Sequence, residues 1–462
     1  MSRKFLVRTF GCQMNEHDSE RLAGLFVAEG MEQAESLDEA DLVVFNTCCI
    51  RENADNKLYG HLGHLKTLRE QRPDLQIAVG GCLAQKDREI VRLKAPHVDV
   101  VFGTHNLSRA PELLRRAAAE GPLVEVLDAP DPALADHAPA LSAVRELPYA
   151  GWVTIQTGCD NSCAFCIVPA VRGPEASRPV AEVVAEVGAL ARRGVVEVTL
   201  LGQNVNSYGR DLTRRRPLFA ELLRAVGSVD GVRRVRFTSP HPKDLRPETI
   251  AAMAEVGPVC EQLHLPLQAG SDRVLSAMRR GYTAERYLAR LAAARAAVED
   301  LAVTTDLIVG FPGETEADFT ETLAVVAEAQ FDSAYTFIFS PRPGTRAAAM
   351  RDAFVAPDVV ADRFERLRQV VERSALGRNQ ARVGRIEEVL VEGPSRRDPG
   401  LATGRTRQGK LVHFPPAGDG APAPGAFCEV EVTGAAPHHL VGSLVRMTAA
   451  PVHRRRIPVT AA

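Results

Sequence analysis

The stretch Thr157-Gly158-Cys159-Asp160-Asn161-Ser162-Cys163-Ala164-Phe165-Cys166 sets three cysteines in a CxxxCxxC spacing, directly after an apolar run at 152–156. Three thiolates can hold three irons of a 4Fe–4S cluster, which leaves one iron open to an outside molecule. A Cys3His zinc site is the alternative, but structural zinc takes four ligands and no histidine follows within ten residues. The stretch therefore predicts a catalytic iron–sulfur cluster with Cys159, Cys163 and Cys166 as ligands.

The region around this stretch predicts a parallel barrel. Apolar strand-like runs alternate with helix-like stretches such as 180–193 and 317–329. Repeated strand–helix units place a parallel sheet inside and helices outside, and six units predict an incomplete (βα)6 barrel. Chemistry gathers at the carboxyl ends of the strands in such folds, and the cysteine loop follows the first strand. The predicted strands are 153–156, 196–201, 235–238, 262–267, 303–309 and 334–339.

A second set of cysteines follows apolar runs nearer the N-terminus. Cys12, Cys48 and Cys82 each come just after a strand-like run. If these strands are parallel, the three thiols share one edge of an open α/β sheet, which is where ligands bind in such folds. Buried structural cysteines are the alternative, yet three equivalent positions favour metal ligands. Cys49 is ambiguous, and Cys48 is preferred because it completes the pattern of strand ends.

The chain divides into an α/β N-terminal part, an α/β barrel and a small antiparallel β-barrel. The last part is rich in Gly and Val, with short alternating runs such as 386–391 and 411–414, as expected of a barrel. The predicted divisions are an N-terminal domain with an auxiliary cluster at 3–125, a linker at 126–148, the central domain at 149–376, a C-terminal barrel at 378–448 and a flexible tail at 449–462.

Charge restricts where a nucleic acid could bind. The whole chain of 462 residues has a formal net charge of −2, so a binding surface must be a local patch. From residue 378 onward there are 12 Lys and Arg against seven Asp and Glu. Arg405, Arg407 and Lys410 flank one predicted pair of strands and are the expected RNA contacts. A solvated barrel face is the alternative.

These motifs together resemble a known family. A CxxxCxxC loop opening a βα barrel is similar to the radical S-adenosylmethionine (SAM) superfamily, and an added three-cysteine domain resembles its methylthiotransferases. The stretch 201–208, Leu-Gly-Gln-Asn-Val-Asn-Ser-Tyr, looks like the MiaB-type tRNA enzymes, as do Gly404-Arg405-Thr406 in a TRAM-like barrel. Ala269 departs from the pattern, where Ser is expected. The other matching stretches are 9–15, 46–48, 80–82, 172–175 and 177–178.

The resemblance implies an enzyme that modifies tRNA. It implies two 4Fe–4S clusters and SAM, of which one molecule methylates sulfur and a second yields the radical that takes hydrogen from the substrate. The implied product carries a methylthio group on carbon 2 of N6-isopentenyladenosine beside the anticodon, in a single-stranded loop whose bases are accessible. A reductase or flavodoxin-type protein is the expected electron donor, and the sulfur source is open. With no apolar run long enough for a membrane span, the expected location is cytoplasmic.

The resemblance also implies which strand ends contact SAM. The loop 306–314 ends the fifth strand with glycines and supplies Gly310 and Glu314, although an ordinary strand-to-helix turn would look the same. Gly202 and Gln203 end the second strand and Ser239 ends the third. All five are expected to bind the cofactor. Arg172 and Arg178 follow the cysteine loop and are expected to pair with a carboxylate or a phosphate, with solvated surface arginines as the alternative.

Two other functions remain open at this point. Related enzymes act on threonylcarbamoyladenosine in tRNA or on an aspartate of a ribosomal protein, and the stretches 204–208 and 404–406 favour the isopentenyladenosine substrate. A non-enzymatic iron–sulfur protein that binds RNA or senses redox state is the second alternative. That protein would need neither a barrel shaped for SAM nor two clusters with open irons.

Overall fold

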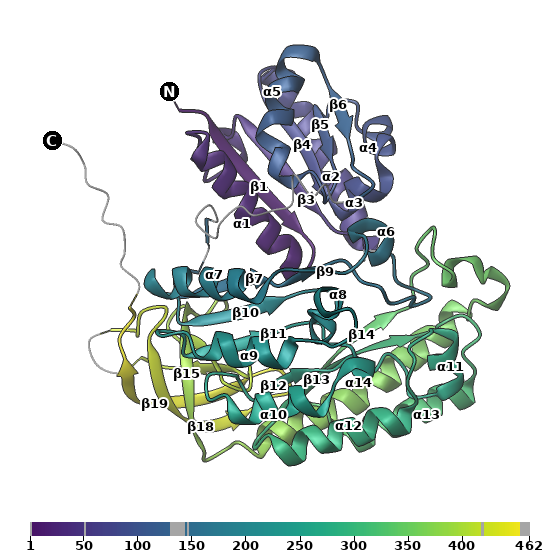
Figure 1. Ribbon diagram of the computed structural model, residues 1–462, viewed down its shortest axis with the longest axis vertical. Helices are drawn as coiled ribbons and strands as arrows, with labels where there is room; N and C mark the ends of the chain where they lie inside the picture. The colour runs from purple at the N-terminus through teal and green to yellow at the C-terminus, as the bar shows by residue number, and fades with distance from the viewer. Residues whose placement is uncertain (1, 50–51, 130–143, 146, 417–419, 453–462) are drawn as a thin grey trace.

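The computed structural model describes residues 2–49, 52–129, 144–145, 147–416 and 420–452. They form three bodies. An N-terminal α/β body stands at the top of Figure 1, a larger barrel lies below it, and a small β-barrel closes one end of that larger barrel. The predicted linker and tail lie largely outside the described residues, so the domain boundaries stay a prediction. Among the described residues, no helix is both long and apolar enough to cross a membrane.

The N-terminal body is the predicted open parallel sheet, in the order β2-β1-β3-β4-β5-β6. Helices cover both of its faces, which explains why all six residues of β3 are buried. The helices α1 and α5 pack on one face, and α2, α3 and α4 pack on the other. The strands are β1 Lys4–Phe10, β2 Glu32–Gln33, β3 Leu42–Thr47, β4 Gln76–Gly81, β5 Val100–Phe102 and β6 Leu123–Glu125. The helices are α1 Gln13–Ala28, α2 Glu52–Gln71, α3 Cys82–Asp87, α4 Glu89–Lys94 and α5 Ala110–Glu120.

The central body confirms the incomplete six-stranded parallel barrel. Its strands form two three-stranded sheets, β11-β10-β7 and β12-β13-β14, joined by a single bridge between Val235 and Val259. In the described part of the chain no ladder joins β14 back to β7, so the barrel is open on that side. The strands are β7 Ala150–Thr154, β10 Glu197–Leu201, β11 Arg234–Phe237, β12 Gln262–His264, β13 Ala302–Val309 and β14 Ser333–Ile338.

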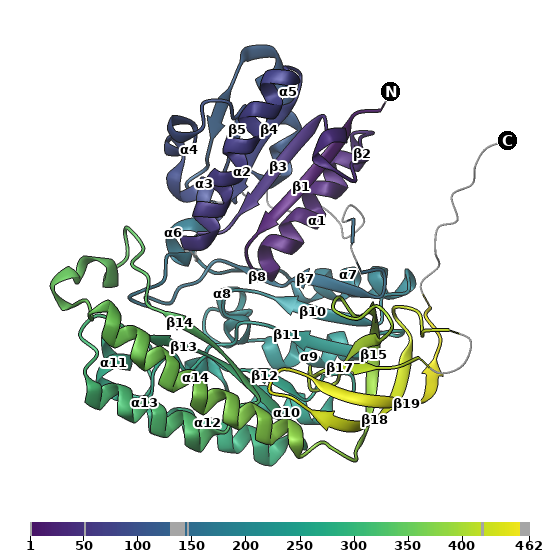
Figure 2. The same cartoon turned by 180° about the vertical axis from the view of Figure 1, so that it is seen from behind.

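Amphipathic helices cover the outside of this barrel and bury its largest apolar core. The helix α9, for example, turns Leu222, Leu223 and Val226 inward, at the spacing of one helical face. Figure 2 shows α12, α13 and α14 side by side along the outer surface. These outer helices are α7 Val180–Arg192, α9 Phe219–Gly227, α10 Pro247–Glu255, α12 Ala284–Ala297, α13 Glu316–Ala329 and α14 Pro357–Gln380. Shorter elements near the mouth are β8 Gln156–Thr157, α6 Val168–Arg172, β9 Ala176–Ser177, α8 Arg210–Thr213 and α11 Asp272–Ala277.

The C-terminal body is a closed five-stranded barrel in the order β15-β16-β17-β19-β18. Along β16 and β17 buried residues alternate with more exposed ones, as the sequence predicts for a small barrel. One pairing differs from the antiparallel prediction, because β17 and β19 run parallel. The long hairpin of β18 and β19 returns to close the barrel beside β17. The strands are β15 Ile386–Pro394, β16 Ala402–Thr406, β17 Leu411–Phe414, β18 Phe427–Ala435 and β19 Leu440–Ala449.

The turn between β16 and β17 docks against the amino ends of the central strands. Arg236 on β11 donates to the carbonyls of Thr406 and Arg407, at 2.9 and 2.8 Å. Arg234, which has no exposed surface, donates to the carbonyls of Arg405 and Glu388. Buried arginines that satisfy backbone carbonyls hold the two bodies in one register. The carboxyl ends of the central strands are therefore the end left for a site.

Candidate functional site

The CxxxCxxC loop lies at the carboxyl end of the first barrel strand. After β7 the chain forms the short strand β8, and the amide of Cys159 then donates to the carbonyl of Gly173 at 3.1 Å. Gly158 makes this close return possible. It has a φ of +76°, and a Cβ atom there would overlap the carbonyl oxygen of Pro174. The loop is thus folded back on the segment that follows it.

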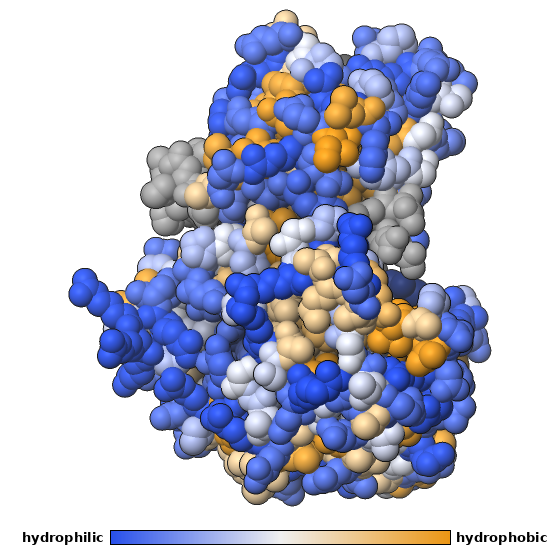
Figure 3. Space-filling view, turned by 90° about the vertical axis from the view of Figure 1, so that its right-hand side faces the viewer, coloured by the Kyte–Doolittle hydropathy of each residue, from blue (hydrophilic) through white to orange (hydrophobic). Residues whose placement is uncertain are grey.

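The three cysteines of this loop line one hollow of about 520 Å³. Gly344, Thr345 and Arg346, from a distant part of the chain, also line it. Figure 3 looks at the side of the molecule where the carboxyl ends of the barrel strands lie, and shows a waist between the N-terminal body and the larger body below. The hollow has room for a group larger than a single ion, and three thiols are among the donor atoms that line it.

Burial keeps two thiols of the loop protonated in the absence of a metal. Burial raises the pKa of Cys166 to about 12 and also raises the pKa of Cys159. These thiols stay neutral until a metal brings positive charge that favours the thiolate. Among the described residues, no three His, Cys, Asp or Glu side chains converge as ligands of one ion. In a cubane each thiolate binds a different iron, so convergence on one point is not required.

Side-chain hydrogen-bond donors reach two of the three sulfurs. The side-chain amide of Asn161 lies 3.5 Å from the Cys159 sulfur, and Lys243 donates to the other end of that amide at 2.7 Å. The Arg280 guanidinium donates to the Cys163 sulfur at 3.2 Å. Sequence reasoning missed Lys243 and Arg280, because both come from turns far along the chain. Donors of this kind stabilise the thiolate form that a metal needs.

Three of the predicted SAM contacts stand at the carboxyl ends of neighbouring strands. Gly202 and Gln203 follow β10, and Ser239 comes two residues after β11. The side-chain oxygen of Gln203 is buried without a hydrogen-bond partner among the described residues. Ser239 has a φ of +59°, which is uncommon for serine and typical of functional sites. An unsatisfied buried acceptor and a strained serine at this edge fit a bound ligand.

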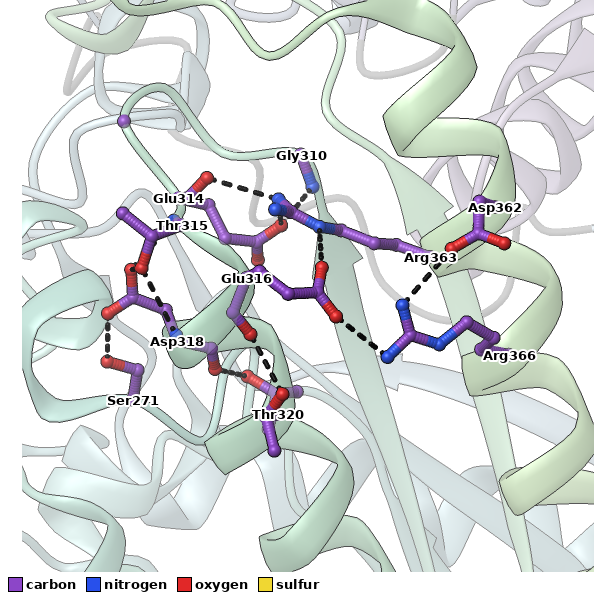
Figure 4. A network of polar contacts seen from close by, with 12 residues as sticks. Ser271, Gly310, Glu314, Thr315, Glu316, Asp318, Thr320, Asp362, Arg363 and Arg366 are labelled. Atoms are coloured by element: carbon purple, nitrogen blue, oxygen red, sulfur yellow. Dashed lines mark hydrogen bonds and ion pairs between the residues drawn. The ribbon is translucent and has the colours of Figure 1, made fainter.

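Glu314 forms a buried ion pair behind this edge. Its carboxylate has 1% exposed side chain and pairs with the buried Arg363 of α14 at 3.0 Å, and it also accepts from the amide of Gly310 at 2.9 Å (Figure 4). Gly310 itself faces α14, since a Cβ there would lie 2.6 Å from Val360. Arg363 donates to Glu316 as well. Glu314 therefore ties the loop to α14, and both of these contacts end on its Oε2.

The N-terminal cysteines gather at one edge of the sheet, as the strand pattern predicts. The register pairs Phe10 with Thr47 and Thr47 with Gly81, which aligns the ends of β1, β3 and β4. Cys48 and Cys82 follow directly after the ends of β3 and β4, and Cys12 follows the end of β1 after one intervening residue. Cys48 and Cys82 are buried, and Cys12 is half-buried.

Two neighbouring residues, Cys49 and Arg172, change the pKa of one of these thiols. The fully buried Cys49 shares a hydrogen bond with Cys82, which together with the charge of Arg172 lowers the pKa of Cys82. A lowered pKa favours the thiolate that a metal requires. Since Cys48 and Cys49 are both buried, the choice of Cys48 as ligand stays a prediction.

The helix α6 links the two cysteine sets. It follows the CxxxCxxC loop, and its Ile167 and Val171 belong to the same apolar cluster as Cys82. Arg172 ends this helix and forms a buried ion pair of 2.7 Å with Asp18 of α1. Arg178 pairs with Glu186 at 2.6 Å and donates to the carbonyl of Thr154. Both arginines therefore meet carboxylates of the protein, one of the two partners that the sequence allowed.

The predicted RNA residues do not form one exposed patch. Lys410 is 8% exposed and its ammonium lies 2.7 Å from Asp332, a buried residue of the central body. Arg407 pairs with Glu261 and donates to the carbonyls of Gly257 and Val259. Both residues belong to the junction between two bodies, so the expectation that they contact RNA is corrected. Arg405 pairs with Glu392 and keeps 47% of its side chain exposed.

Family models match most of the chain. The radical SAM superfamily matches residues 153–326, the uncharacterized protein family UPF0004 matches residues 4–103, and the TRAM domain matches residues 380–445. Several relatives carry the name tRNA-2-methylthio-N(6)-dimethylallyladenosine synthase. One from Mycobacteroides abscessus is 53% identical over 95% of this chain and 88% of its own length. One from Rhodococcus jostii is 54% identical over 98% of this chain and 90% of its own length.

Solved structures with the same fold are more distant in sequence. The radical S-adenosylmethionine methyltransferase TsrM from Kitasatospora setae superposes with a TM-score of 0.56 at 15% identity, covering 75% of this chain and 77% of that one. The cobalamin-dependent radical enzyme OxsB gives a TM-score of 0.50 at 12% identity, covering 80% and 56%. At such identities the likeness concerns the fold alone.

The close return at Gly158 makes a testable prediction. Gly158→Ala should displace the loop and leave about four irons per chain in place of about eight, by the count of one cubane per cysteine set. Iron analysis after anaerobic reconstitution measures this. Gly344→Ala is the matched control, because Gly344 also has a positive φ and lines the same hollow, but its nearest neighbour would lie 3.8 Å away. Full iron content in Gly158→Ala would contradict the packing argument.

The buried ion pair of Lys410 and Asp332 at the junction makes a second testable prediction. Lys410→Met should lower stability by about 3 kcal/mol, because it leaves the Asp332 carboxylate buried without its cation. Chemical denaturation measures the shift. Arg405→Met, which breaks the more exposed pair with Glu392, should cost less than about 1 kcal/mol. Equal effects of the two substitutions would contradict the assignment of Lys410 to the junction.

Proposed function

The chain belongs to the family of the tRNA-2-methylthio-N(6)-dimethylallyladenosine synthases, and we propose that it transfers a methylthio group to carbon 2 of N6-isopentenyladenosine beside the anticodon of tRNA. It is a radical SAM enzyme. The observation that carries the proposal is the approach of two three-cysteine sets across the helix α6. A binding protein or a redox sensor would need only one such set.

The residues present fit two clusters and SAM. Cys159, Cys163 and Cys166 would hold the cluster at the mouth of the barrel, and a second would lie at the sheet edge formed by three other cysteines, Cys12, Cys48 and Cys82. When bound, the clusters and SAM would supply the radical chemistry by which a methylthio group replaces the hydrogen of an unactivated C–H bond, which acid–base groups alone cannot do. The protein supplies the geometry around them.

The chain's own part in this reaction is to position and enclose. The α6 connection fixes the spacing between the two cysteine sets, with Arg172 and Asp18 as a buried tie. The unsatisfied oxygen of Gln203 and the strained Ser239 are the proposed polar contacts to SAM, beside the backbone at Gly202. Gly310 and Glu314 support this edge from behind, through α14. Fixed placement of this kind contributes strongly to rate.

The tRNA substrate reaches this site as a folded RNA whose target base lies in a loop. We propose that Arg405 makes a phosphate contact from the C-terminal barrel, since about half of its side chain is exposed. A reductase or a flavodoxin-type protein is the proposed source of electrons.

Nucleoside mass spectrometry of tRNA tests the function. Cells lacking this protein should lose 2-methylthio-N6-isopentenyladenosine and accumulate N6-isopentenyladenosine, and the gene supplied in trans should restore the product. Loss of the methylthio derivative of threonylcarbamoyladenosine would instead assign the other tRNA substrate. Unchanged tRNA, with a changed mass of a ribosomal protein, would reject tRNA as the substrate.

A further inference from the structure

The turn between α11 and α12 contacts the CxxxCxxC loop in two places. The carbonyl of Met278 accepts from the amide of Ala164 at 2.9 Å, and the Arg280 guanidinium donates to the Cys163 sulfur at 3.2 Å. Residue Arg280 is 6% exposed. Two contacts from one turn to adjacent residues of the loop fix both the backbone and one sulfur.

The remaining hydrogen bonds of Arg280 hold its guanidinium in place. Its Nε donates to the Tyr282 hydroxyl at 3.1 Å, and its Nη2 reaches the carbonyl of Pro266 at 3.4 Å. The Tyr282 hydroxyl in turn lies 2.8 Å from the carbonyl of Leu267. The guanidinium is therefore oriented by a backbone segment of the barrel, independently of the cysteine loop.

The positive charge of Arg280 has no carboxylate partner in the described part of the chain. Its contacts are a phenol, a thiol and a carbonyl. Burying a charge without an opposite charge is costly. The structure therefore lacks an anion beside Arg280 until the cysteines carry negative charge.

Arg172 gives an internal comparison. It is also a buried arginine beside a cysteine set, but the Asp18 carboxylate lies 2.7 Å from it. Its charge is largely compensated before any metal is bound. The two cysteine sets thus meet arginines in different electrostatic states, and the uncompensated one faces the loop at the barrel mouth.

We propose that Arg280 is the counter-cation of the cluster held by Cys159, Cys163 and Cys166, and that it raises the potential at which this cluster accepts an electron. A 4Fe–4S core held by three thiolates is net negative and becomes more negative on reduction. A fixed positive charge and a donor to a ligand sulfur both favour the reduced form. In this step one electron passes from a low-potential donor, which is oxidised, to the cluster, and no proton moves.

The inference rests on the proposed function in that it needs a cluster at this loop. Arg280 acts through Cys163 and is a positioning residue. The test is a reductive titration of the reconstituted full-length protein without SAM, using titanium(III) citrate and following the reduced cluster by electron paramagnetic resonance. The Cys12, Cys48 and Cys82 triple alanine background leaves the barrel cluster as the observed species.

Arg280→Gln should lower the ratio of reduced to oxidised cluster at least tenfold at a given potential, which corresponds to about 59 mV for one electron. Arg280→Lys keeps the positive charge but loses the planar set of guanidinium N–H donors. Its titration curve should therefore fall between those of the parent and of Arg280→Gln. Arg279→Gln is the matched control, because the neighbouring Arg279 is exposed and should titrate like the parent.

The possible outcomes separate a failure of the inference about Arg280 from a failure of the proposed function. Overlapping titrations of the parent, Arg280→Gln and Arg280→Lys would overturn the inference. If Arg280→Gln holds no cluster, Arg280→Lys carries the test, and an unshifted curve there would overturn it. An unshifted titration with weakened SAM binding would overturn it too, because Arg280 would then serve SAM alone. A parent protein without any cluster at this loop would instead reject the proposed function.

Discussion

Alanine at Cys159, Cys163 and Cys166 together is expected to abolish the conversion of SAM to 5′-deoxyadenosine. These cysteines supply every thiol that lines the hollow at the barrel mouth, so no other sulfur there can replace them. The variant should also retain about four irons per chain where the parent holds about eight, by one cubane per set. Iron analysis and chromatography of 5′-deoxyadenosine measure the two effects.

Cys260→Ala is the control for this variant. Cys260 is a buried thiol outside both sets, and its removal should leave iron content and SAM cleavage near those of the parent. A parent protein with only about four irons would reject the second cluster, by the same count. Residual SAM cleavage in the triple variant would reject these cysteines as the ligands of the radical-generating cluster.

Alanine at Cys12, Cys48 and Cys82 together should separate the two halves of the chemistry. Methylthiolated tRNA should disappear, while reductive cleavage of SAM continues at a rate close to that of the parent. SAM cleavage should continue because these thiols lie at the edge of the N-terminal sheet, in a different body from the barrel loop. Nucleoside mass spectrometry and the 5′-deoxyadenosine assay, run on the same reactions, measure the separation.

The neighbouring Cys49 supplies the control here. Cys49→Ser keeps a small buried group that can still hydrogen-bond Cys82, so product formation should persist. Cys48→Ser, in contrast, should behave like the triple variant. The reverse result, with Cys48→Ser active and Cys49→Ser inactive, would exchange the two assignments. Methylthiolated product from the triple variant would remove the N-terminal set from the reaction.

Much of the architecture follows from local patterns in the sequence. Strand and helix periodicity placed all six barrel strands, and the runs before Cys12, Cys48 and Cys82 placed three parallel strand ends at one edge. Both results depend on short-range regularities, namely alternation, helical spacing and the position of a cysteine after a strand. Parallel topology then aligns the strand ends without further information.

The roles of charged side chains could not be predicted in this way. Arg407 and Lys410 look like a basic patch in the sequence, but Glu261 and Asp332, more than 70 residues earlier, draw them into the junction. Glu314 likewise meets Arg363 across the loop and α14. An ion pair depends on which distant segments of the chain come into contact, and the local sequence does not predict those contacts.

Local patterns in the sequence were sufficient to predict the three-body α/β and β-barrel organisation, the two three-cysteine sets and the kind of metal group that they suit. The tertiary structure alone decided that α6 joins the two sets, that the C-terminal barrel closes the amino end of the central one, and that Arg280 faces Cys163 without a carboxylate. The two kinds of feature differ in how far apart along the sequence the residues that produce them lie. Periodicity and ligand spacing are encoded within a few residues, whereas burial of charge and contact between bodies arise only when segments distant in the chain pack together.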